Sequence, residues 1–146
     1  MHKTITMKSK FAAAVAGASL LLIAGSAFAV TVPGFAGKPE LGSDAACLNV
    51  NGAAMLNQCG RQIIYKIPLV VNAGSKTVTV RTNNPGGGTF SCQLIVSSPF
   101  ATTTPVFPNV GIQTFSLGIN VPSNANLQIF CQVNPGGQVI DVNYNQ

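Results

Sequence analysis

Apolar and polar residues alternate strictly in six short runs that follow residue 61 and are separated by turn residues. The runs cover residues 62–71, 76–82, 89–97, 113–121, 127–133 and 138–144. Successive side chains of a strand point to opposite faces, so a period of two is typical of strands that are buried on one side. The pattern therefore predicts an all-β protein, a two-sheet antiparallel β-sandwich.

The same alternation predicts which side chains face the core. Pro68 interrupts the first run, and because proline cannot donate to a ladder it indicates an edge position or a bulge. The last run is expected to bury Ile140, Val142 and Tyr144 and to expose Val139, Asp141 and Asn143.

Two turns have the same sequence, Asn-Pro-Gly-Gly, at residues 84–87 and 134–137. Proline fixes φ at the first central position of a turn, and the glycine after it supplies a positive φ. Both turns are therefore expected to close hairpins. The first would join 76–82 to 89–97, and the second would join 127–133 to 138–144.

The connection from Ser98 to Ile112 contains three prolines and has no regular period. A connection of this length is either a crossover between sheets or a functional loop. Phe100, Thr103 and Phe107 are its candidate binding residues. The alternative is that its apolar side chains plug one end of the sandwich.

The N-terminus has the three parts of a secretory signal peptide. Three lysines, at positions 3, 8 and 10, precede an apolar stretch over 11–24 and small residues that end at Ala29. About 14 apolar residues are too few to span a bilayer, and no later stretch is longer. We expect residues 1–29 to be a signal peptide cleaved near Ala29, 30–46 a flexible lead-in, and 47–146 one secreted or periplasmic domain without a transmembrane segment.

Four cysteines, Cys47, Cys59, Cys92 and Cys131, lie after the predicted cleavage point. An even number in an oxidising compartment predicts two disulfides, for which three connectivities exist. Cys92 and Cys131 both fall on the apolar faces of their runs, which favours the pairs 47–59 and 92–131. Their spacings match no zinc signature, and we expect no metal and no cofactor.

The charged residues exclude several functions. Removal of the three N-terminal lysines lowers the net charge from +5 to +2, and the remaining cations are scattered, so no nucleic acid is expected as a partner. The only histidine is His2, and the only acids are Glu40, Asp44 and Asp141. We therefore expect no catalytic residues and no enzyme. A small hydrolase that depends on Asp141 is the remaining catalytic alternative.

Charged residues make up 8% of the chain, against about 25% in ordinary globular proteins. A surface with few charges resists self-association weakly, so the leading hypothesis is a structural or adhesive domain of the bacterial surface that assembles with itself or a protein partner. The lack of tryptophan argues against a carbohydrate ligand. The alternative is a soluble secreted binding module or inhibitor that uses the 98–112 loop.

Overall fold

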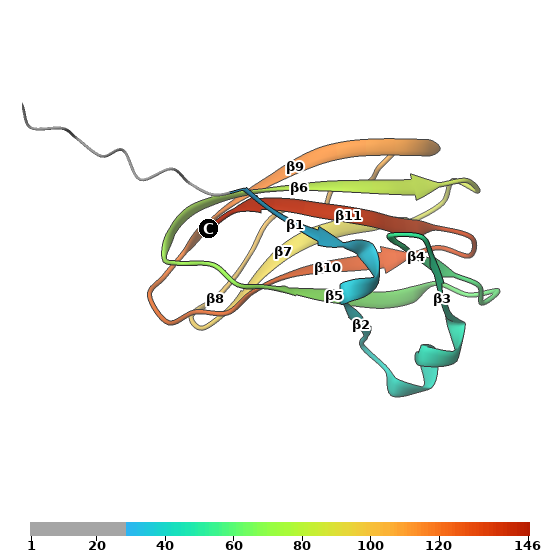
Figure 1. The fold of residues 1–146 in the computed structure, drawn as a ribbon, viewed down its shortest axis with the longest axis horizontal. Coiled ribbons are helices and arrows are strands. Elements are labelled where there is room, and N and C mark those ends of the chain that lie inside the picture. Colours follow the sequence, from blue (N-terminus) through green and yellow to red (C-terminus); the bar gives the residue numbers. More distant parts are fainter. Residues whose placement is uncertain (1–28) are drawn as a thin grey trace, which may run out of the picture.

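The computed structural model describes residues 29–146, which form two antiparallel β-sheets stacked face to face (Figure 1). This arrangement confirms the predicted β-sandwich. Apart from Ala29, the predicted signal peptide lies outside the described residues.

Sheet A has the strand order β3-β4-β11-β6-β9, and β1 also pairs with β11. Its strands are β1 (Ala29–Pro33), β3 (Leu48–Asn51), β4 (Ala54–Asn57), β6 (Gly74–Asn84), β9 (Gly111–Val121) and β11 (Gln138–Asn145). Sheet B has the order β2-β5-β10-β7-β8. Its strands are β2 (Lys38–Pro39), β5 (Ile63–Leu69), β7 (Ser91–Ser97), β8 (Phe100–Thr102) and β10 (Leu127–Val133). The 3-10 helices η1 (Gly34–Ala36) and η2 (Gly42–Cys47) flank β2.

The core fills the space between the sheets and follows the predicted alternation in five of the six runs. On β5, β7 and β10 every second residue is buried, for example Ile67, Leu94 and Ile129, each of which is fully inaccessible. Pro68 lies beyond the short pairing of β5 with β2, which ends at Lys66. At Pro68, one side of β5 has no neighbouring strand, which agrees with the absence of a backbone N–H in proline.

The first part of β11 buries other side chains than the alternation predicts. The register of β11 against β6 shifts between Val139 and Asp141. Such a bulge adds one residue to one strand and reverses the alternation that precedes it. Val139 is consequently fully buried and Ile140 only half-buried, whereas Val142 and Tyr144 are buried as expected.

The two Asn-Pro-Gly-Gly turns do not close hairpins, so that prediction was wrong. The first leads from β6 in sheet A to β7 in sheet B, and the second from β10 in sheet B to β11 in sheet A. β6, β10 and β11 pair instead with strands that are distant in the sequence, and β7 pairs with distant β10 and with β8, which follows it directly. Turn chemistry sets the local reversal of the chain, but contacts far along the chain decide whether the two strands share a sheet.

Residues 30–46, expected as a flexible lead-in, are in contact with both sheets. β1 pairs with β11 over five residues, and Val30 and Val32 pack against the core. A Cβ at Gly34 would lie 1.8 Å from the carbonyl oxygen of Val139, so η1 can approach β11 only without a side chain there. The lead-in differs from expectation because it contributes two strands, β1 to sheet A and β2 to sheet B, and apolar side chains to the core.

The segment between Cys47 and Cys59 is a hairpin. β3 and β4 pair directly, with Asn51 opposite Ala54. Gly52 turns the chain with a φ of 62°, a value that favours glycine. Ala54 and Met55 are buried on β4.

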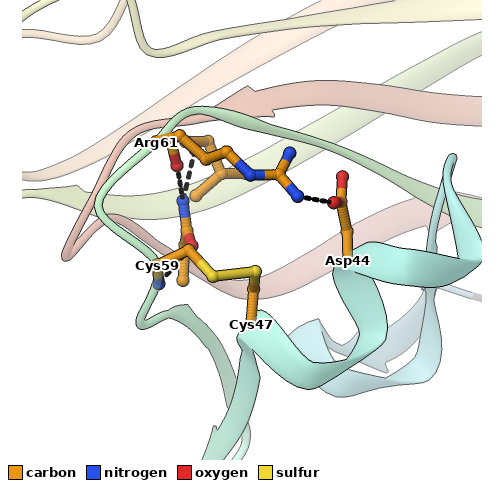
Figure 2. The surroundings of a disulfide bond; sticks show 6 residues. Asp44, Cys47, Cys59 and Arg61 are labelled. Carbon is orange, nitrogen blue, oxygen red and sulfur yellow. Dashed lines mark hydrogen bonds and ion pairs between the residues drawn. A yellow bond between two sulfur atoms is a disulfide. The ribbon is translucent and has the colours of Figure 1, made fainter.

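Both disulfides form with the favoured connectivity, Cys47–Cys59 and Cys92–Cys131. Cys92 and Cys131 lie directly opposite each other on β7 and β10 and are buried in the core. Figure 2 shows that the other disulfide ties the end of η2 to the loop after β4.

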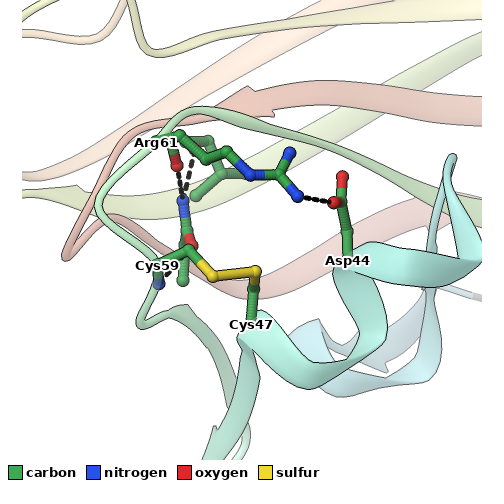
Figure 3. Close-up of polar contacts among 6 residues, drawn as sticks. Asp44, Cys47, Cys59 and Arg61 are labelled. Carbon is green, nitrogen blue, oxygen red and sulfur yellow. Dashed lines mark hydrogen bonds and ion pairs between the residues drawn. A yellow bond between two sulfur atoms is a disulfide. The ribbon is translucent and has the colours of Figure 1, made fainter.

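Polar contacts strengthen the same junction (Figure 3). The guanidinium of Arg61 pairs with the buried carboxylate of Asp44 on η2. The fully buried Asn57 amide donates to the carbonyl oxygens of Arg61, at 2.9 Å, and Val133, at 2.8 Å, and accepts the Cys59 N–H at 3.0 Å. We call this junction the Asn57 cluster.

Candidate functional site

All three acidic side chains of the described residues form ion pairs. Arg61 pairs with Asp44, Lys66 with Glu40, and Arg81 with Asp141. Each acid has a different cation as its partner, so the structure gives no support to a pair of carboxylates acting on one substrate. Across residues 29–146 no three metal-ligating side chains gather in one group, and no helix is long and apolar enough to cross a membrane.

One half of the sandwich carries no charge at all. No Asp, Glu, Lys or Arg occurs between Arg81 and Asp141. β7, β8, β9 and β10, with the connections between them, belong entirely to this segment. The side chains of these four strands are apolar, hydroxyl or amide groups, and the nearest cations come from neighbouring strands, such as Lys66 of β5, whose Nζ lies 5.7 Å from the centre of the Phe130 ring.

A cavity of about 440 Å³ lies where β5 and β7 end and β10 begins. The Ser97 N–H donates to the carbonyl oxygen of Asn126 at 3.0 Å, which holds the end of β7 against the start of β10. Ser97 also lies opposite Phe100 on β8. We call this space the Phe100 cavity. It is lined by Pro68, Leu69, Val70, Val71, Ser97, Ala125, Asn126, Leu127 and Gln128.

One exposed apolar side chain lines the Phe100 cavity, and a second lies opposite one of its lining residues. Val70, on the wall, is 77% exposed, and Phe100, the strand partner of Ser97, is 74% exposed. These are the highest exposures among the large apolar residues of the described chain. The Val70 N–H donates to the Tyr144 hydroxyl at 3.3 Å, which fixes the chain where β5 ends. Cavities of this size with apolar walls and a few polar groups are typical of small-ligand sites.

The structure separates the three residues expected to form the binding loop. Phe100 lies opposite Ser97, which lines the cavity. The Thr103 hydroxyl accepts the Leu94 N–H at 3.0 Å, so Thr103 fastens the segment to β7. Phe107 follows Val106, which pairs with Cys92 near the other end of β7. The 98–112 segment is also the crossover from sheet B to sheet A, the other interpretation of its length.

Several cavity residues were missed by sequence reasoning. Val70 and Asn126 come from two separate connections and Gln128 from the start of β10, and no local motif links them. The one available signal was the uncharged segment between Arg81 and Asp141, which marks out half of the molecule without indicating a cavity.

Two further depressions lie elsewhere on the molecule. One, of about 620 Å³, lies beside the Asn57 cluster and is lined largely by residues 56–60 and by Pro135 and Gly136. The other, of about 260 Å³, is lined by residues of β1, β6 and β11, among them Thr77 and Asn143. None of the three depressions has an exposed aromatic ring among its lining residues, and the Phe100 cavity differs in that exposed Phe100 lies opposite its lining residue Ser97.

Comparison with solved structures identifies the fold. The chain is similar to the carbohydrate-binding module CBM6cm-2 of Cellvibrio mixtus lichenase 5A, solved with cellotriose, with a TM-score of 0.51 and 10% identity over 80% of this chain and 96% of that one. The chain is also similar to the C-terminal CBM6 of the laminarinase LamC from Zobellia galactanivorans, with a TM-score of 0.52 and 10% identity over 82% of this chain and 100% of that one. For CBM35 from Paenibacillus barcinonensis, the TM-score is 0.51 and the identity 10%, over 82% of this chain and 98% of that one. No family model matches the sequence, and no curated protein matches it either.

These comparisons correct the expected function. The chain has the fold of carbohydrate-binding modules, so the hypothesis of a self-assembling structural or adhesive domain was wrong, and so was the argument against a carbohydrate ligand. The alternative of a soluble binding module agrees better with this fold. The low charge was misinterpreted, because a surface of hydroxyls and amides suits a neutral sugar as well as it suits a second protein.

Two other expectations agree with the likeness. The similar structures are non-catalytic modules, in line with a chain that is not an enzyme. Two disulfides in a fold of this kind indicate a domain that works outside the cytoplasm.

Proposed function

We propose that this protein is a non-catalytic secreted module that binds an uncharged carbohydrate in the Phe100 cavity. The observation that carries the proposal is an exposed apolar side chain on the cavity wall, Val70, with a second one, Phe100, opposite the lining residue Ser97. A sugar ring has apolar faces that pack on an aromatic ring and hydroxyls that need hydrogen-bond partners. Phe100 and Val70 meet the first need, and Ser97, Asn126 and Gln128 meet the second.

The similar structures support this choice of ligand class. One was solved with cellotriose, and a further match, with a TM-score of 0.51 and 9% identity over 82% of this chain and 28% of that one, is a Podospora anserina GH26-CBM35 β-(1,4)-mannanase. The absence of charge from β7 to β10 favours a neutral polysaccharide over an acidic one.

Binding by the oxidised protein from residue 30 onward tests the proposal. The protein is screened on an array of neutral and acidic polysaccharides, and the best ligand is titrated by calorimetry. We expect Phe100→Ala to weaken binding roughly fivefold or more, because an aromatic contact contributes about 1 kcal/mol beyond its buried area.

Val50→Ala provides the matched control. Val50 is 60% exposed but lies on β3 in sheet A, outside the Phe100 cavity, so its replacement removes exposed apolar surface without touching the site. The proposed function is wrong if the wild-type protein binds no polysaccharide on the array, or if both variants bind as the wild type does.

We further propose that residues 1–29 are removed on export to the periplasm or the medium. Cleavage after Ala29 would leave Val30, Thr31, Val32 and Pro33 of β1 to pair with β11, so the mature chain would retain this edge of sheet A. Mass spectrometry of the exported protein is expected to give an N-terminus at or next to Val30. An exported protein that retains its first 29 residues would contradict the proposal.

A further inference from the structure

The outermost strand of sheet B continues past the end of β8. Phe100 lies opposite Ser97 near one end of β7, and Val106 lies opposite Cys92 near the other. Residues 100–106 therefore run antiparallel along most of β7. At about 3.3 Å per residue, the five-residue step between Ser97 and Cys92 separates Phe100 from Val106 by roughly 17 Å.

The side chains of this edge divide between the core and the solvent. Ala101 and Val106 are half-buried and pack against the core. Phe100 and Thr102, on either side of Ala101, are exposed, and so is Thr104. Phe107, directly after Val106, is 63% exposed. The solvent side of the edge thus has an aromatic ring at each end and threonine hydroxyls between them.

Hydrogen bonds hold the edge in place before any ligand binds. Thr103 donates its N–H to the Leu94 carbonyl at 3.1 Å and accepts the Leu94 N–H on its hydroxyl at 3.0 Å. Val106 and Cys92 exchange two backbone hydrogen bonds, of 2.9 and 3.0 Å. A surface that is already ordered loses little conformational entropy when a ligand binds to it.

We propose that the ligand is an extended neutral glycan chain that runs from the Phe100 cavity along this edge to a second contact at Phe107. The inference rests on the proposed function and specifies the ligand of the same site. Because the edge lies within the uncharged segment between Arg81 and Asp141, a glycan with carboxylate or sulfate groups would meet no cation there. The protein would then bind along a polysaccharide chain, with affinity that grows with chain length.

Calorimetric titration with cello-oligosaccharides and β-1,4-manno-oligosaccharides, from the disaccharide to the hexasaccharide, tests the inference. For whichever series binds, we expect the wild-type affinity to rise until the ligand spans the edge and then to level off. Phe107→Ala should weaken binding of the longest ligand roughly fivefold and leave that of the disaccharide unchanged. Phe100→Ala should weaken binding at every length, and Val50→Ala at none.

The outcomes separate this inference from the proposed function. If Phe100→Ala weakens binding and Phe107→Ala changes it at no length, the extended site is wrong and the cavity site stands. An affinity that is already maximal for the disaccharide also overturns the extended site. If neither series binds to any variant, the test is repeated with fragments of the polysaccharide that the array selects. Failure of every polysaccharide on the array overturns both proposals.

Discussion

Burial controls the ionisation of Tyr65. Tyr65 is 1% exposed, and its hydroxyl donates to the Gly34 carbonyl at 3.0 Å. Desolvation by burial raises its pKa to about 12, and a backbone hydrogen bond at Gly37 has a smaller effect that lowers the pKa. In the unfolded chain a tyrosine ionises near pH 10. Between about pH 10 and 12 the unfolded state therefore binds fewer protons than the folded state, so stability falls as the pH rises.

This linkage predicts the effect of Tyr65→Phe. The wild type should lose on the order of 2–3 kcal/mol of unfolding free energy between pH about 10 and about 12 from this group, because each pKa unit corresponds to about 1.4 kcal/mol. Tyr65→Phe is expected to be less stable at neutral pH, because the Gly34 carbonyl loses its donor. Its unfolding free energy should nevertheless fall less between these pH values, by about the same 2–3 kcal/mol, because the variant lacks the ionising group. Urea unfolding of both proteins across the pH range measures the difference, and parallel curves would contradict the prediction.

Asn57 satisfies three backbone groups from one buried side chain. Replacement by alanine would leave the carbonyl oxygens of Arg61 and Val133 and the N–H of Cys59 without this partner. Since unsatisfied buried polar groups cost about 1–3 kcal/mol each in the worst case, we expect Asn57→Ala to destabilise the protein by roughly 2–4 kcal/mol. Asn49→Ala, at an exposed position of β3, is the control and should change the unfolding free energy by less than about 0.5 kcal/mol.

The packing of η1 against β11 depends on the missing side chain at Gly34. A Cβ there would overlap the backbone of Val139 and Ile140, whereas a Cβ at Gly42 on η2 would meet nothing within 4 Å. Gly34→Ala must therefore displace η1 from β11, and we expect it to cost roughly 1–3 kcal/mol or more. Gly42→Ala should be neutral. Thermal unfolding of the two variants checks this pair, and equal melting temperatures would show that η1 does not need its close contact.

Elements formed by local sequence were the ones that could be predicted. The runs around Leu94, Leu117 and Ile129 became β7, β9 and β10 because their alternation is long and regular. The short strands β1, β2, β3, β4 and β8 were not predicted. Val30 and Phe100, for example, lie in segments too short or too rich in proline for a period to be recognised, and they form strands because a neighbouring strand offers backbone partners.

The division of charge across the molecule predicts how binding depends on salt. All eight charged side chains of the described residues lie outside the segment between Arg81 and Asp141, which contains β7 to β10. The Phe100 cavity takes part of its wall from residues 68–71, outside that segment, but none of its lining residues is charged, so electrostatic attraction contributes little to binding there. Salt screens only electrostatic terms. We expect the glycan affinity to change less than about twofold between 0.05 and 0.5 M NaCl, measured by calorimetry. A tenfold loss would indicate that a charged ligand or a charged face is involved.

Alternation along the chain was sufficient to predict a two-sheet sandwich, and the position of the cysteines on apolar faces was sufficient to favour their pairing. Both are local properties, because a side chain's face depends on its neighbours along the strand. The exchange of sheets at the two Asn-Pro-Gly-Gly turns, the bulge at Val139 and the cavity beside Phe100 depend on contacts between segments far apart in sequence. Only the folded chain brings Val70, Ser97 and Asn126 together, because three separate strand ends meet there and no single run of residues encodes that meeting.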